Sequence, residues 1–150
     1  MRKGLRFLPY PLLSAILGIC SLRPEALLAQ QVAIIVNKSN EVGDLNLDQV
    51  KKIFLGDKST WPNGRRISVL ARPSGQAERD VVLKQIYRMA DSEYNKYFMQ
   101  AAFTGRIAAP PKETASSADM KRLVAENPGA IGYIKKEEAD DSVKTVLTIP

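Results

Sequence analysis

The sequence predicts an α/β domain in which a mainly parallel sheet is flanked by helices. Strand-like runs alternate with helix-like segments along the chain, which is typical of parallel sheets with helices on their faces. The first strand-like run, "VAIIV" at Val32–Val36, is apolar throughout, as expected of a strand that is covered on both faces. The chain has 150 residues, a length that favours one domain.

The N-terminal segment has the features of a secretory signal peptide. Three basic residues precede a mostly apolar stretch, Leu8–Leu22, which is too short for a comfortable membrane span. We therefore predict that residues 1–29 are a signal peptide cut after Ala29, and that residues 30–150 form the domain. An uncleaved membrane anchor is the alternative. The expected protein is periplasmic and meets the membrane only through this segment, before cleavage.

The first half of the domain contains two strand–helix pairs. A helix is predicted after Asn46, whose side chain can cap it while Gln49 occupies the capping-box position, and Gly56 ends this helix. A second strand is predicted at Ile67–Ala71. The helix after it is predicted to run from Ala77 to about Met89, because its apolar residues fall on one face.

The second half contains two helices and then two strands. A helix capped near Asp91 or Ser92 is predicted to end at Gly105, and an extended loop follows because two adjacent prolines forbid helix there. Ser116 is predicted to cap the last helix. The final strands are predicted in "AIGYI" and "VKTVLTI".

The composition argues against enzymatic function. The only cysteine, Cys20, lies in the predicted signal peptide, and the chain has no histidine. The commonest general base and the commonest transition-metal ligand are therefore missing, and no pair of base and nucleophile can be identified. We accordingly expect no catalytic residue, no metal site and no cofactor.

The charge favours a small anion as ligand. Four lysine and arginine residues and one glutamate lie in residues 1–29, so the net charge of the remainder is +3 instead of +6. This mild excess is compatible with an oxyanion, and no aromatic residues interleave the basic pairs as in nucleic-acid-binding surfaces. We therefore expect no nucleic-acid partner.

The turn after the second strand is the main candidate site. Gly75 allows a ligand close to the backbone, and Ser74 and Gln76 add side-chain donors at a helix start. Arg72 and Arg79 can each bind a tetrahedral oxyanion through two nitrogens. The alternative is purely structural: the serine caps the helix, one arginine pairs with a nearby acid and the other is solvated. Spacing alone leaves both interpretations open.

Two further residues follow the first strand. If the sheet is parallel, Lys38 and Ser39 lie at the same sheet edge as Ser74, because the carboxyl ends of parallel strands meet there. They are predicted as secondary members of the anion site.

Five motifs in order resemble those of the phosphate-binding proteins of bacterial phosphate ABC transporters. They are the strand end "VNKSN", the helix "LDQVKKIFLG", the loop "WPNG", the turn "RPSG" after a strand, and the strand "PGAIGYI". The likeness covers most of residues 32–134 and is greatest to short, single-domain members. It implies one lobe of a type II periplasmic-binding-like fold, phosphate or a similar oxyanion as ligand, an ABC transporter as partner, and no catalysis.

The turn departs from the pattern of that family, which reads roughly Arg, any, Asp, Gly, Ser, Gly, Thr. Arg72 and Gly75 match, whereas Ser74 replaces the aspartate and Glu78 replaces the threonine. The first hypothesis is thus an exported, non-enzymatic oxyanion-binding protein linked to phosphate transport. The alternative is a periplasmic protein–protein interaction module that keeps the fold, has lost the ligand, and contacts an envelope protein.

Overall fold

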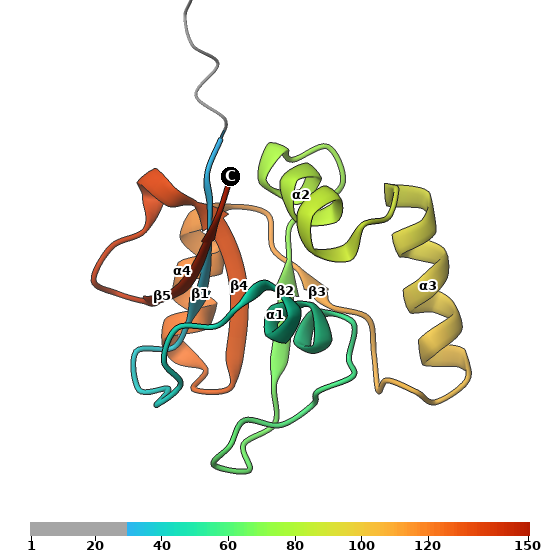
Figure 1. Cartoon of the computed structure of the whole chain (residues 1–150), viewed down its shortest axis with the longest axis horizontal. Coiled ribbons are helices and arrows are strands. Elements are labelled where there is room, and N and C mark those ends of the chain that lie inside the picture. Colours follow the sequence, from blue (N-terminus) through green and yellow to red (C-terminus); the bar gives the residue numbers. More distant parts are fainter. Residues whose placement is uncertain (1–29) are drawn as a thin grey trace, which may run out of the picture.

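The structure is a computed structural model that describes residues 30–150 (Figure 1). The predicted signal peptide, residues 1–29, lies outside the described residues. In the part described, no helix is long and apolar enough to cross a membrane. The elements in chain order are β1 (Val32–Val36), α1 (Leu47–Phe54), β2 (Ser68–Ala71), α2 (Ala77–Val82), the π-helical segment η1 (Leu83–Tyr87), α3 (Asp91–Phe103), β3 (Lys112–Glu113), α4 (Ser117–Glu126), β4 (Ala130–Lys135), the 3-10 segment η2 (Lys136–Glu138) and β5 (Lys144–Ile149).

The strands form one sheet with the order β3-β2-β4-β1-β5. β2 is parallel to both of its neighbours, β3 and β4, whereas β1 is antiparallel to both of its neighbours, β4 and β5. Four strands therefore point the same way and β1 alone runs against them. The predicted α/β class and the helix-flanked sheet are confirmed. The expectation that the first strand joins the parallel set is wrong. An apolar run indicates that a strand is buried, but it does not indicate the direction in which the strand runs.

The sheet is covered on both faces, as the apolar β1 predicts. On one face, Ile34 belongs to a core that includes side chains of α1, α2, η1 and α3. On the other face, Ile35 packs in a second core with Met120 and Val124 of α4. All five residues of β1 are fully buried. Each of its valine and isoleucine side chains contributes roughly 1.5–3 kcal/mol through removal from water, so β1 is central to the stability of both layers.

Two helix starts form as the sequence predicts. The side chain of Asn46 accepts the N–H of Gln49 at 2.9 Å, and the Gln49 side chain accepts the N–H of Asn46 at the same distance. At α4, the hydroxyl of Ser116 accepts the N–H of Asp119 at 3.0 Å. These local hydrogen bonds satisfy donors that a helix start leaves unpaired.

Three details differ from the sequence prediction. The predicted helix from Ala77 to Met89 is α-helical only to Val82 and continues as η1, after which Arg88 has a φ of 55° and ends it. α3 begins after Ala90, so neither Asp91 nor Ser92 is its cap. The predicted proline loop contains a short strand, β3, whose parallel pairing with β2 supplies the stabilisation that the local sequence lacks.

Candidate functional site

The turn between β2 and α2 lies beyond the carboxyl end of β2, as predicted. Gly75 has a φ of +85°, a left-handed conformation that costs glycine little. Apart from its chain neighbours, no atom lies within 4 Å of the position that a Cβ would take there. α2 begins at Ala77, and Gln76 at its N-cap makes no side-chain capping hydrogen bond. The turn therefore has an open backbone in front of an uncapped helix start.

Arg72 is bound by its own chain. The residue is 5% exposed, and its Nε donates to Oε1 of Glu78 at 2.7 Å. One Nη donates to the carbonyl oxygen of Thr114 at 2.8 Å, and the other donates to Oε1 of Gln76 at 3.2 Å. Glu78 is itself only 2% exposed. Because a buried carboxylate needs this partner, the guanidinium of Arg72 has a structural role.

Arg79 is also buried, at 1% exposure. Its Nε donates to Oδ1 of Asp91 at 2.8 Å, and Nη1 donates to the carbonyl oxygen of Arg72 at 2.7 Å. Its guanidinium carbon lies 4.4 Å from the centre of the Tyr94 ring, a cation–π contact. Nη2 lies 2.8 Å from the same oxygen of Asp91 but has no aligned hydrogen bond. Arg79 thus joins the turn to the start of α3.

The carboxylate of Asp91 occupies the place that the sequence predicts for a ligand anion. The hydroxyl of Ser74 donates to its Oδ2 at 2.7 Å, while Arg79 holds Oδ1. The hydrogen bond from Ser74 is the largest cause that lowers the pKa of Asp91 below its ordinary value; partial burial opposes it and Arg79 reinforces it. Asp91 is also the first residue of α3, where the helix dipole favours a negative charge.

The turn is not strongly electropositive. The buried guanidiniums of Arg72 and Arg79 face three carboxylates, because Oε1 of Glu113 also lies 3.4 Å from Arg79. Neither guanidinium is therefore free for a two-nitrogen grip on a ligand. The purely structural alternative also differs from the structure: Ser74 does not cap α2, Arg72 is not solvated, and the acid that pairs with Arg79 is not a neighbour in sequence.

The structure brings together five of the seven predicted site residues and separates the other two. Lys38 and Ser39 lie at the opposite end of the strands from the turn, because β1 runs antiparallel to β4 and therefore against β2. The hydroxyl and N–H of Ser39 donate to Oδ1 of Asn37, whose amide in turn donates to two carbonyl oxygens at the end of α4. The expectation that these two residues share the anion site is wrong.

Sequence reasoning missed the partners of the turn. Asp91, Glu113 and Thr114 all contact the arginines, and the hydroxyl of Tyr133 accepts the N–H of Arg72 at 2.9 Å. Burial raises the pKa of Tyr133, so its hydroxyl stays neutral. The partners come from the start of α3, from β3 and the residue after it, and from β4, and only the tertiary fold places them together. Glu78, three residues after Gly75, was the one signal in the local sequence that the arginines have an acidic partner.

Comparison with known proteins supports the resemblance. A family model for the PBP superfamily domain matches residues 24–148. The phosphate-binding protein PstS of Bacillus subtilis is 28% identical over an alignment of 134 residues that covers 83% of this chain and 39% of that protein. An ABC-type phosphate transport receptor from Vibrio cholerae matches with a TM-score of 0.62 and 25% identity, over 78% of this chain and 45% of the receptor.

A second solved structure is similar to the same degree. It is a proposed phosphate ABC transporter substrate-binding protein from Clostridium perfringens with bound phosphate, with a TM-score of 0.62 and 29% identity over 79% of this chain and 45% of that one. The chain thus spans less than half the length of the relatives it matches. With the family model covering most of the chain and the fold matching these receptors, the chain belongs to the PBP superfamily domain family and is similar to phosphate receptors of ABC transporters.

Proposed function

We propose that this chain is an exported, periplasmic, non-enzymatic protein that binds phosphate or a similar oxyanion and works with ABC-type phosphate transport. The named relatives are phosphate-binding proteins and receptors, which supports the ligand class. The N-terminal sequence pattern supports export. The observation that carries the proposal is that the turn already holds an anion, the carboxylate of Asp91, through Ser74 and Arg79.

Binding of an external oxyanion requires displacement of Asp91. Its side chain is 40% exposed and Asp91 is the first residue of α3, so the carboxylate can turn into water and be hydrated there. The oxyanion then takes the donors of Ser74 and Arg79 and approaches the open backbone at Gly75. Because displacement of an ion-paired carboxylate opposes binding, and because the chain supplies one lobe only, we expect weak binding, in the millimolar range by the usual affinity scale.

Thermal unfolding in phosphate, sulfate and chloride at matched ionic strength tests this function. Ligand at about 100 times its dissociation constant stabilises the folded state by roughly 2.7 kcal/mol, which raises the melting temperature by several degrees for a domain of this size. We expect phosphate to produce this shift and chloride to produce none. Equal shifts in all three salts indicate a general salt effect and contradict a specific oxyanion site.

A second candidate function is an interaction module that keeps the fold and has lost the ligand. It is favoured by the complete use of Arg72, whose nitrogens bind Glu78, Thr114 and Gln76. In this case the functional surface is elsewhere and contacts an envelope protein. Absence of any phosphate effect in the wild type and also in a variant without the Asp91 charge selects this candidate over the first.

A further inference from the structure

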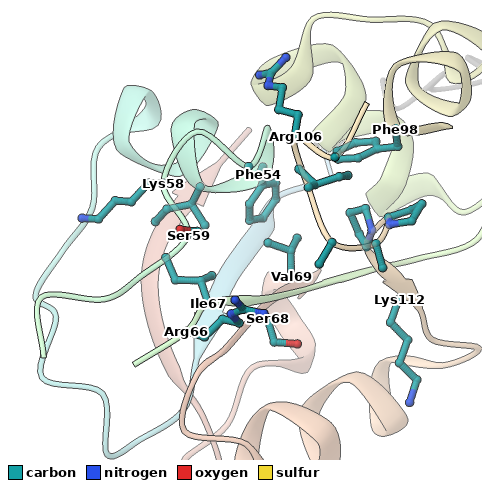
Figure 2. A pocket seen from close by; sticks show the side chains of 18 of the residues that line it. Phe54, Lys58, Ser59, Arg66, Ile67, Ser68, Val69, Phe98, Arg106 and Lys112 are labelled. Atoms are coloured by element: carbon teal, nitrogen blue, oxygen red, sulfur yellow. The ribbon is translucent and has the colours of Figure 1, made fainter. Parts of the chain in front are cut away.

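A groove lies at the other end of β2 from the turn (Figure 2). Its cavity volume is about 830 Å³, and its walls are the loop after α1 and the segment between α3 and β3. The floor is apolar: Phe54 and Phe98 are buried at its base, and Val69 with other partly buried apolar residues offers the area that a ligand can cover. Trp61 anchors the loop wall, because this side chain is 2% exposed and its Nε1 donates to the carbonyl oxygen of Gly129 at 3.0 Å. The fold therefore holds the loop wall in place, and the groove is preformed.

The charges around this groove have one sign. Lys58, Arg66, Arg106 and Lys112 line it and are exposed, and no aspartate or glutamate is among the lining residues. Within residues 30–150, only Arg106 of these four forms an ion pair, with Asp57 at 2.7 Å. The positive charge of the other three is therefore not offset by a carboxylate in the described part of the chain. A ligand that binds here would remove apolar floor atoms from water and would neutralise several cations at the same time.

The cations are distributed rather than gathered at one point. In Figure 2, Lys58 and Lys112 extend outward at opposite sides of the pocket, and Arg106 lies on a third side. A ligand with a single anionic head group meets only one of these positions. A chain with several spaced carboxylates can meet all of them, so the spacing favours a peptide over an anionic amphiphile.

The backbone of β2 beside the groove is already paired. The N–H of Ser68 donates to the carbonyl oxygen of Gly129 at 3.0 Å, and the N–H of Ile67 donates to the carbonyl oxygen of Ser59 at 2.8 Å. Further along, β2 pairs with β3. A ligand in this groove therefore contacts the side chains of the floor and the rim and does not add a strand to the sheet.

We propose that this groove docks an extended, acidic segment of a partner protein, with apolar side chains on the floor and carboxylates against the basic rim. The surface is independent of the oxyanion turn, because the two lie beyond opposite ends of β2. The proposal thus goes beyond oxyanion binding and stands or fails separately from it.

Fluorescence anisotropy with a labelled synthetic peptide tests the docking. The probe alternates acidic with apolar residues, and the matched control peptide has lysine at every acidic position. We expect the acidic probe to bind and its affinity to fall as salt is raised, whereas the basic peptide does not bind. Equal binding of both peptides, or binding of neither, overturns the proposal.

Charge reversal locates the site on the protein. The double variant Lys58→Glu with Lys112→Glu is expected to weaken binding of the acidic probe by about tenfold or more, since two attractions become repulsions. The control, Lys96→Glu, changes another exposed lysine that does not line the groove and should leave the affinity within about twofold. Because all three lysines are exposed, the variants should fold. Equal losses in both variants overturn the proposed location.

Other occupants give different results in parallel titrations. Displacement of the probe by dodecanoate, with equal efficiency in wild type and double variant, identifies the floor as an amphiphile site and overturns the peptide assignment. A concentration-dependent dimer in sedimentation that the double variant abolishes identifies a second copy of the chain as occupant and overturns it also. We expect neither displacement by dodecanoate nor a dimer.

Discussion

Replacement of Arg72 by alanine is expected to lower the free energy of unfolding by about 3–5 kcal/mol, the usual cost of removing one partner from a buried ion pair. Arg72 and Glu78 have side-chain exposures of 6% and 2%, and their atoms Nε and Oε1 are 2.7 Å apart. Without the guanidinium, the carboxylate of Glu78 and the carbonyl oxygen of Thr114 lose their partner in the interior. Urea unfolding of both proteins measures the difference.

Two further variants separate the buried pair from a general effect of charge. Arg65→Ala removes an exposed arginine seven positions away and is expected to change stability by less than about 0.5 kcal/mol. The double replacement Arg72→Met with Glu78→Leu removes both charges together and should recover most of the loss. If Arg72→Ala is no more destabilising than Arg65→Ala, the pair does not hold the turn together and the structural role of Arg72 is wrong.

The second large effect is a gain of oxyanion binding in Asp91→Asn. The substitution keeps the shape of the side chain but removes the charge that competes for Ser74 and Arg79. At full strength, a unit charge at about 4 Å is worth about 4 kcal/mol near a protein surface. Because Asp91 is 40% exposed, solvent screening reduces this. We expect phosphate to bind about tenfold more tightly, or about 1.4 kcal/mol, as measured by isothermal titration calorimetry.

The matched control is Asp140→Asn. This aspartate is 52% exposed and pairs with Lys121 at 2.6 Å, so its replacement removes the same charge from a similar surface pair elsewhere. Its phosphate affinity should equal that of the wild type. Mild acidification does not substitute for the mutation, because the pKa of Asp91 lies below its ordinary value and the carboxylate stays ionised. Equal gains in the two variants would show that only net charge matters and would contradict a role for Asp91.

Local signals in the sequence predicted the elements of the fold well. The run at Val32–Val36 is buried on both faces, and the reciprocal hydrogen bonds of Asn46 with Gln49 form as the capping box predicts. These features depend on residues close together in the chain. The direction of β1 does not depend on nearby residues, because the same apolar run fits a parallel or an antiparallel neighbour. The wrong placement of Lys38 and Ser39 follows directly from that ambiguity.

The sequence grouped five residues of the candidate site but did not predict their partners. These five residues lie together because they are neighbours in sequence: Arg72, Ser74, Gly75, Gln76 and Arg79. Asp91, however, follows Ser74 by 17 residues and belongs to another helix, and Glu113 and Thr114 come from beyond that helix. No periodicity links these segments, so the sequence left open whether the guanidiniums are free, whereas the structure has ion pairs. The arrangement of the strands and the position of α3 bring these partners to the turn.

The oxyanion site is tested most directly when backbone amide signals are followed by NMR while inorganic phosphate is added to the wild-type protein. We expect concentration-dependent shifts that are largest at Gly75, Gln76 and Ala77 and that extend to Asp91 as its carboxylate leaves Ser74. Sulfate, which is tetrahedral like phosphate, should reproduce the pattern of shifts, and chloride should not. Shifts confined to the basic groove around Lys58 and Lys112, or no shifts at all, would contradict the proposal that the turn after β2 is an oxyanion site.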